Sequence, residues 1–264
     1  MTRQLLIYDD PVPLSSETHR ELSLRAQAGM PYAAGLNSVP IVVAEFEKVA
    51  AEYPIVFAGT GEATMPVALL GLGAGENLFL GADDAWQGRY VPAFLRRYPF
   101  VFAGEAGERL TLCMDMKHPG VNREGRGERL FDADGNRTRY LEEMLRFVSD
   151  YQAQHVATQV VCRRIDELGL LEEARADAVA PSGVRRQLTG FRSLNATKLA
   201  QLEDVMVLEL FRADILRLLH LQLASLEQLG ALARRLPEAA QTAAEADPAP
   251  AEPAPADPAP ADSD

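Results

Sequence analysis

The sequence is short of cysteine, of basic residues and of long hydrophobic runs, and each shortage argues against a class of protein. Its two cysteines, Cys113 and Cys162, belong to no Cys-x-x-Cys pair, so neither a zinc ribbon nor a thioredoxin-type redox site is predicted. We expect two free thiols in a reducing cytoplasm rather than a disulfide. Only 26 Lys and Arg stand against 38 Asp and Glu, and the net charge of −12 lacks the basic footprint of proteins that bind nucleic acid or anionic membranes.

Hydrophobic runs are too short for membrane insertion. None approaches the roughly 18 apolar residues that a spanning helix needs. Residues 1–10 hold one base and a four-residue apolar run, which is too short for the core of a signal peptide. We therefore predict a soluble, cytoplasmic protein with no membrane span, unless a dedicated signal-independent route exports it.

Motifs of catalysis and cofactor binding are also missing. Gly71–Gly75 is glycine-rich, but no Gly-Lys-Ser/Thr follows, which favours a turn over a phosphate-binding loop. Asp132–Asn136 resembles the start of a calcium loop, but its glycine stands at the fourth place instead of the sixth, which favours a hairpin turn. His155 and His220 have no second ligand three or four residues away, and no Gly-x-Ser-x-Gly motif accompanies His118. The sequence predicts no catalytic residue, cofactor or metal site, and it leaves open whether the protein is an enzyme.

The last 28 residues, 237–264, differ from everything before them. They contain seven acids and no base, so the preceding 236 residues carry only −5 of the net charge. Residues 247–261 are three tandem Asp/Glu-Pro-Ala-Pro-Ala units, which lack core-forming residues and favour extended polyproline II structure. We predict a globular domain over residues 1–236 and a disordered, acidic, Pro/Ala-rich tail over 237–264. A solubilising role is the simpler interpretation of the tail, and recognition through its repeats is the alternative.

Within the domain, residues 1–135 are predicted to be rich in strands. Short apolar runs of strand length are separated by turn signals; they are Ile41–Val43, Ile55–Phe57, Val67–Leu70, Leu78–Leu80, Phe100–Phe102 and Leu110–Cys113. A short helix is predicted between the first two runs, over Ala44–Glu52, because its apolar residues share one helical face.

One sequence pattern occurs twice in this region. Tyr53–Gly59 (Tyr-Pro-Ile-Val-Phe-Ala-Gly) returns 45 residues later as Tyr98–Gly104 (Tyr-Pro-Phe-Val-Phe-Ala-Gly). Since proline disfavours helical geometry in the residue before it, both tyrosines are predicted to end helices, 45–52 and 90–97, and to lead into strands. An old duplication and an independent use of the same joint both explain the pattern.

Residues 138–235 are predicted to be the helical part of the domain. A stripe with alternating steps of four and three indicates one long helix over 138–168; its members are Met144, Val148, Tyr151, His155, Thr158, Cys162 and Ile165. Gly169 is a plausible end, and a second helical region follows over 196–235, with a break near Asp204. The predicted fold class is α+β, a mixed or antiparallel sheet domain with C-terminal helices packed on it.

The segment from Trp86 to Tyr98 is the candidate recognition site. It combines the single tryptophan with arginine and tyrosine side chains, which together suit an anion or a partner carboxylate; the candidate residues are Trp86, Arg89, Tyr90, Arg96 and Arg97. Adjacent helical residues point about 100° apart, so at most one of Arg96 and Arg97 is expected in the packed face. The alternative interpretation is structural, with the arginines paired to nearby acids and the tryptophan at a core edge.

The order of several strings resembles the SapC family over roughly residues 5–230. The strings are Pro13-Leu14 with His19, Ser38–Ile41 with Glu45-Phe46, Tyr53–Phe57, Ala68–Leu72 with Gly75–Phe79, Trp86 with Arg89–Phe100, Leu130-Phe131 with Asp134-Gly135 and Thr138, Leu188–Gly190, Lys198-Leu199, and His220-Leu221 with Ser225-Leu226. This is the bacterial family named for an association with surface layers, and not the peptide-transport permease of the same label, whose spanning helices this chain lacks.

The resemblance implies a function class and no catalytic residue. The leading hypothesis is a non-enzymatic accessory or interaction protein linked to bacterial surface-layer (S-layer) or outer-membrane systems. The alternative is an enzyme or small-ligand-binding protein that uses the Trp86 to Tyr98 segment. The expected partner is accordingly a protein or a small anionic ligand.

Overall fold

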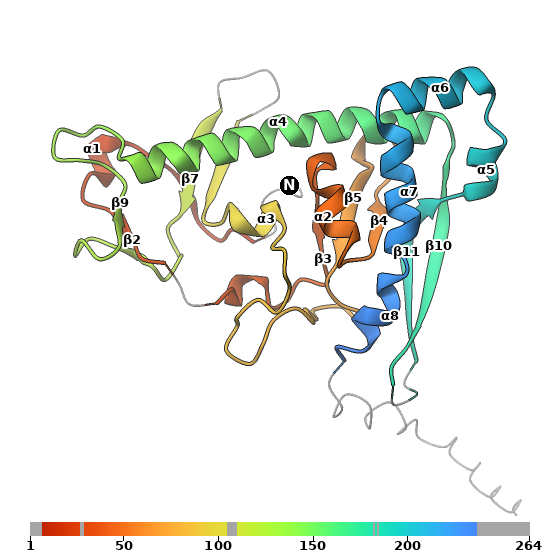
Figure 1. The fold of residues 1–264 in the computed structure, drawn as a ribbon. Coiled ribbons are helices and arrows are strands. Elements are labelled where there is room, and N and C mark those ends of the chain that lie inside the picture. The colour runs from red at the N-terminus through yellow and green to blue at the C-terminus, as the bar shows by residue number, and fades with distance from the viewer. Residues whose placement is uncertain (1–6, 27–28, 105–109, 182, 184, 237–264) are drawn as a thin grey trace, which may run out of the picture.

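One long helix, α4 (Arg139–Glu167), crosses two antiparallel sheets in the computed structural model of this chain (Figure 1). The structure describes residues 7–26, 29–104, 110–181, 183 and 185–236. Mixed helices and antiparallel sheets confirm the predicted α+β class, with helices following the sheets toward the C-terminus. The predicted tail, 237–264, lies outside the described residues.

The larger sheet has five strands in the order β10-β11-β4-β5-β3. These are β10 (Leu171–Val179), β11 (Arg185–Leu194), β4 (Ile55–Ala58), β5 (Met65–Leu69) and β3 (Ser38–Pro40). β11 pairs with β4 through one residue pair only, Arg192 with Phe57. Where the two strands separate, the buried Gln222 amide takes the place of a peptide group: it donates to the Ile55 carbonyl (2.9 Å) and accepts from the Leu194 N–H (3.3 Å).

The other strands form two small sheets. One has the order β1-β7-β6, and the other β8-β2-β9. Their strands are β1 (Pro11–Pro13), β7 (Thr111–Asp115), β6 (Phe100–Ala103), β8 (Val121–Asn122), β2 (Ser23–Leu24) and β9 (Glu128–Arg129). Among the short helices, α1 (Ser16–His19) lies between β1 and β2 in the chain, η2 (Pro31–Ala33) precedes β3, and η4 (Gly61–Ala63) connects β4 and β5 of the larger sheet.

The repeated Tyr-Pro pattern has the same three-strand topology in both copies. In each copy a short helix, α2 (Phe46–Ala50) or α3 (Ala93–Arg96), precedes the Tyr-Pro pair, and a strand and an antiparallel partner follow. The partner strand is central in both: Ala68 lies between Ile55 and Val39, and Met114 lies between Phe100 and Val12. The outer strands are Ser38-Val39-Pro40 and Pro11-Val12-Pro13, with Val-Pro in equivalent places. We name these the first unit (β4-β5-β3) and the second unit (β6-β7-β1).

The stripe predicted on 138–168 is the buried face of α4. Thr138 caps the helix through its hydroxyl, which accepts the Leu141 N–H at 3.4 Å, and Gly169, with φ +64°, follows its end. Val148, Tyr151, Thr158, Cys162 and Ile165 are buried, whereas Met144 and His155 are half-buried. The helix therefore contributes to the core over most of its length, as its periodicity predicts.

The predicted second helical region is four helices. They are α5 (Ala196–Ala200), α6 (Asp204–Arg212), α7 (Ile215–Ser225) and α8 (Gln228–Ala233). α7 packs on α2 and on β4 and β11. The expected break near Asp204 is present, and further breaks fall at residues 213–214 and 226–227.

Three segments differ from their predictions. The hairpin β10–β11 lies inside the part predicted to be helical, because the run Leu171–Val179 has the composition of a helix and shows its alternation only through buried Ala176 and Ala178. None of the predicted strand Ile41–Val43 is in a strand, since β3 ends at Pro40 and Val43–Glu45 is a 3-10 turn (η3). Leu80 forms only an isolated bridge with Trp86.

Candidate functional site

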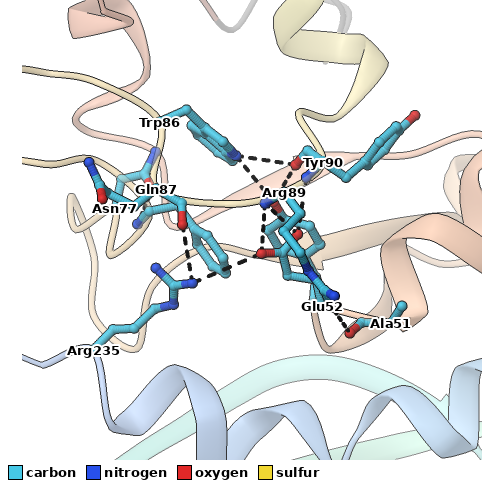
Figure 2. Close-up of polar contacts among 10 residues, drawn as sticks. Ala51, Glu52, Asn77, Trp86, Gln87, Arg89, Tyr90 and Arg235 are labelled. Atoms are coloured by element: carbon cyan, nitrogen blue, oxygen red, sulfur yellow. Dashed lines mark hydrogen bonds and ion pairs between the residues drawn. The ribbon is translucent and has the colours of Figure 1, made fainter.

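Trp86 anchors a loop that runs between the first unit and α3. Its ring stacks on the buried Phe79 ring, with centroids 5.6 Å apart and 17° between the planes. Its Nε1–H lies 3.2 Å from both the Tyr53 hydroxyl and the Tyr90 carbonyl (Figure 2), and the Tyr53 hydroxyl donates to that same carbonyl. Burial raises the pKa of Tyr53 above its ordinary value, so this hydroxyl remains a donor. Trp86 thus fills a core edge while its polar group is satisfied.

Gly88 lets the loop approach this cluster. A Cβ at position 88 would lie 2.5 Å from the Tyr53 hydroxyl oxygen and 2.6 Å from Trp86 Nε1. Both distances are well below a van der Waals contact, so any larger residue would displace the hydrogen-bonded groups.

The Glu52 side chain binds the backbone of the next part of the loop. Its carboxylate accepts the Arg89 N–H at 2.9 and 3.0 Å and the Tyr90 N–H at 3.1 Å (Figure 2). Arg235 approaches the same carboxylate at 4.0 Å, donates to the Gln87 carbonyl at 3.5 Å, and lies 4.2 Å from the centroid of the Phe79 ring. Glu52 is therefore shared between the loop and the end of the C-terminal helices.

A second carboxylate, that of Glu45, binds the first residue of α3 and the Tyr90 side chain. It is buried, and it accepts the Tyr90 hydroxyl at 2.8 Å, the Ala93 N–H at 2.6 Å and the Val42 N–H at 3.1 Å. Burial, reinforced by the charge of Glu45, raises the pKa of Tyr90 to about 12. Tyr90 is consequently a neutral hydrogen-bond donor at physiological pH and no general base.

Arg96 and Arg97 diverge by about 100° around the helix and have different environments. Arg97 is 1% exposed, and its guanidinium lies 4.6 Å from the Tyr151 ring, 4.7 Å from the Phe94 ring and 5.7 Å from the Tyr8 ring. It therefore belongs to the core beneath α4.

Arg96 is exposed and lies over two aromatic rings. Its guanidinium is 5.5 Å from the centroid of Tyr90 and 5.1 Å from that of Phe147, and it donates to the Val91 carbonyl at 3.0 Å and the Tyr90 hydroxyl at 3.2 Å. These contacts hold the arginine in place but leave it accessible to solvent.

Two exposed cations lie near the Tyr90 ring, and a third precedes Tyr90 in the chain. Lys48 lies 5.6 Å from its ring, Arg96 lies over the ring, and Arg89 is adjacent in sequence, with its guanidinium donating to the Ala51 carbonyl at 3.4 Å. Among the described residues, none of the three forms an ion pair with an acid. We call this set, Lys48, Arg89, Tyr90 and Arg96, the Tyr90 surface.

The histidines have structural environments. His118 is buried, and its Nδ1 accepts the Gly120 N–H at 2.9 Å; burial lowers its pKa. His155 stacks on Tyr151, and burial, together with the nearby Arg97 charge, lowers its pKa. His220 is exposed, with its Nδ1 2.7 Å from the Leu216 carbonyl.

The other chemical candidates are also accounted for. Cys113 and Cys162 are free and buried, as predicted, and burial raises the pKa of each thiol, that of Cys162 to about 12. The Asp132 carboxylate accepts the backbone N–H groups of Asp134 (2.9 Å) and Asn136 (2.8 Å), which makes the segment a turn. Within the described ranges, no group of three or more His, Cys, Asp or Glu is placed to hold a metal ion, and no helix is both long and apolar enough to cross a membrane.

Three surface hollows lie away from the Tyr90 surface. One of about 720 Å³ is bordered by β7, Phe131 and the first turns of α4. One of about 510 Å³ lies along α7 beside Phe211, and another of about 510 Å³ lies where β11 leaves β4. None of the three is lined by the predicted site residues.

The structure separates the five predicted residues into three kinds. Arg89 and Arg96 are exposed, Trp86 and Tyr90 are half-buried and hydrogen-bonded, and Arg97 is in the core. Sequence reasoning missed the carboxylates that position the segment, and it missed Lys48 and Arg235. The only sequence signal for Glu52 was its place beside Tyr53, equivalent to Arg97 beside Tyr98; nothing local pointed to Glu45, Lys48 or Arg235.

Comparison with known proteins identifies the chain at the level of a family. Neither the curated proteins nor the solved structures include a match to it. One protein-family model, SapC, matches residues 14–232, which include the first Tyr-Pro unit, strands β6 and β7 of the second, the Tyr90 surface and most of the C-terminal helices. Because this match covers most of the chain, the protein belongs to the SapC family.

Proposed function

We propose that this protein is a non-enzymatic interaction protein of the SapC family, which binds acidic groups of a protein partner through the Tyr90 surface. The partner is proposed to belong to a bacterial surface-layer or outer-membrane system, in line with the association that gives the family its name, and the protein to act from the cytoplasm. The observation that carries the proposal is the pair of exposed guanidinium groups, that of Arg89 at the Ala51 carbonyl and that of Arg96 over the Tyr90 ring, neither with an ion pair to an acid among the described residues.

The scaffold beneath these cations favours binding. Glu52 fixes the backbone at Arg89 and Tyr90, and Glu45 fixes the Tyr90 ring on which Arg96 lies. A guanidinium that is already positioned loses less side-chain entropy when it forms a two-point contact with a carboxylate. A charge-assisted contact of this kind contributes roughly 1.5–3 kcal/mol, which is about tenfold or more in affinity.

The shape of the surface favours a macromolecular partner over a small substrate. Small-molecule sites are concave and enclose most of their ligand. Three hollows among the described residues lie elsewhere, and Arg97, the member of the segment that is enclosed, is packed among aromatic rings. This supports the interaction hypothesis over an enzyme or small-ligand site built on the same segment.

The test compares captured partners between matched arginine variants of the full chain. Arg89→Ala and Arg96→Ala are used as baits in lysate of the source bacterium, beside the wild type and Arg163→Ala. Arg163 is an exposed arginine of α4 without an ion pair among the described residues, so it controls for the loss of one positive charge. We expect at least one protein to be captured by the wild type and by Arg163→Ala, and to be lost or reduced about tenfold with Arg89→Ala or Arg96→Ala.

Stability measurements separate binding from folding. Substitution of an exposed side chain normally changes the free energy of unfolding by less than about 0.5 kcal/mol. If all four proteins capture the same partners in equal amounts, the Tyr90 surface is not the binding site. If the variants that lose a partner are also unfolded, Arg89 and Arg96 are structural residues.

A further inference from the structure

The described chain ends beside the Tyr90 surface. Arg235, the last residue but one, donates to the Gln87 carbonyl at 3.5 Å and lies 4.0 Å from Glu52, the carboxylate that holds the backbone of Arg89 and Tyr90 (Figure 2). Leu236 is buried, which anchors this exit point. The tail therefore starts at the border of the cationic surface.

The tail is complementary in charge to this surface. Residues 237–264 hold seven acids and no base, whereas the rest of the chain has a net charge of −5 and would repel them on average. The Tyr90 surface is a local exception, with three exposed cations and no ion pair to an acid within the described residues. Four of the acids recur every fifth residue, at Asp247, Glu252, Asp257 and Asp262.

We propose that the acidic tail, residues 237–264, binds the Tyr90 surface of its own chain and competes there with acidic partners. The proposal rests on the proposed function, because it assigns a regulator to the same site. The contacts are ion pairs between tail carboxylates and the side chains of Lys48, Arg89 and Arg96.

The tether is long enough for this contact. An extended chain advances about 3.3 Å per residue, so Glu238, three residues after Arg235, reaches about 10 Å, and Asp247 reaches about 40 Å. Both acids can therefore return to a surface that begins at the exit point. Different acids of the tail can also occupy the same cations in turn, so the contact does not require one fixed alignment of the tail on the surface.

A short tether makes even a weak contact significant. An attached segment has an effective concentration on the order of 1 mM. A tail contact with a Kd of about 1 mM would then be half occupied and would weaken a competing ligand about twofold. Because the contact is electrostatic and exposed, it should disappear at high salt: the screening length is about 8 Å at 0.15 M and about 3 Å at 1 M.

The decisive experiment places a spin label in the tail of the full chain. The Ala251→Cys protein carries the label, since both native thiols are buried and only 1% exposed. Paramagnetic broadening is read from the backbone amides of Arg89, Tyr90 and Arg96, with those of Glu128 and Arg129 in β9 as the distant reference (Figure 1). We expect the first set to broaden at 0.02 M salt, the reference not to broaden, and the effect to vanish at 1 M.

Charge variants of the labelled protein test the chemistry of the contact. Broadening at Tyr90 should be lost when Arg89→Gln and Arg96→Gln are combined, or when all seven tail acids become their amides, and it should remain in Arg163→Gln. The proposal is overturned if Tyr90 does not broaden at low salt, if it broadens no more than the reference, or if the amide tail broadens it equally.

A competition measurement keeps this result distinct from the proposed function. A synthetic peptide of residues 247–264 is titrated against the wild type and against the chain with the amide tail. We expect about twofold tighter binding to the amide-tail chain, and equal affinities would contradict the competition. If the tail contact is absent but partner capture still depends on Arg89 or Arg96, only the regulatory proposal fails. If the tail contact is present without such capture, only the proposed function fails.

Discussion

The first and second Tyr-Pro units share strand order and register, but they place opposite charges at the same helix end. Glu52 precedes Tyr53 in the first unit, and Arg97 precedes Tyr98 in the second. The Glu52 side chain is 11% exposed and binds the backbone of the loop at residues 89 and 90. Arg97 is 1% exposed and lies among three aromatic rings.

The difference shows that the repeated Tyr-Pro connection between helix and strand determines the local backbone geometry but not the role of each residue in it. What the side chain before the tyrosine meets depends on segments far away in sequence: the Trp86 loop and Arg235 in the first unit, α4 and Tyr8 in the second. Glu52 of the first unit thus supports the exposed Tyr90 surface, whereas Arg97 of the second is part of the core.

The largest effect is expected from a charge placed in the core that covers the second unit. Val148 of α4 is 1% exposed, so Val148→Asp would bury an unpaired carboxylate. We expect a loss of about 3 kcal/mol or more in the free energy of unfolding, or no folded protein. Val160→Asp is the matched control, because Val160 lies on the same helix but is 58% exposed, and it should change stability by less than about 1 kcal/mol. Chemical denaturation measures both, and a Val148→Asp protein of wild-type stability would contradict the buried position.

Substitution of the two equivalent residues tests the comparison directly. Arg97→Ala removes a large buried side chain and its ring contacts, with an expected cost of about 2–4 kcal/mol. Glu52→Ala removes the acceptor of two backbone N–H groups near the surface, with an expected cost of about 1–2 kcal/mol. Denaturant unfolding of both variants measures which substitution causes the larger loss of unfolding free energy. Equal losses, or a larger loss for Glu52→Ala, would contradict the different roles assigned to the two units.

Sequence periodicity predicted the elements whose partners lie on one continuous face. The stripe from Met144 to Ile165 indicated α4 and its buried side, and the Tyr-Pro pairs indicated two helix-to-strand joints. The hairpin β10–β11 was missed because its buried positions, such as Ala176 and Ala178, are small and equally suited to a helix. The hairpin packs against α7 and α8, which follow it in the chain.

The candidate site was predictable in its residue types but not in its support. The density of arginine and aromatic residues indicated the segment from Trp86 to Tyr98, and helical geometry predicted that Arg96 and Arg97 would diverge. Glu45 lies about 45 residues before Tyr90, whose hydroxyl it binds. Arg235 lies about 150 residues after Gln87, whose carbonyl it binds. Contacts across such distances have no local sequence signal, so no pattern could reveal which arginine would be buried.

Acid should destabilise the protein mainly around the second unit. Burial lowers the pKa values of His118, which contacts Tyr98, and of His155, where the charge of Arg97 adds to the effect. A lowered pKa means that the unfolded state takes up more protons below about pH 6.5, so stability is constant above that value and falls as the pH drops through it. His155→Gln cannot be protonated and should reduce the slope of unfolding free energy between pH 7 and 5. An unchanged slope would show that His155 titrates normally.

The smallest effect is expected from removal of the tail, which is attached beside the first unit. Deletion of residues 238–264 removes no apolar residue larger than alanine or proline, so the core is unaffected. A half-occupied contact with the Tyr90 surface stabilises the folded chain by only RT ln 2, about 0.4 kcal/mol, and 1 M salt should abolish even that. We therefore expect the truncated and full chains to differ by less than about 1 kcal/mol in denaturant unfolding at low salt, and not measurably at high salt. A larger difference that persists at high salt would mean that the tail packs on the domain through apolar contacts, and the first unit would then be incomplete without it.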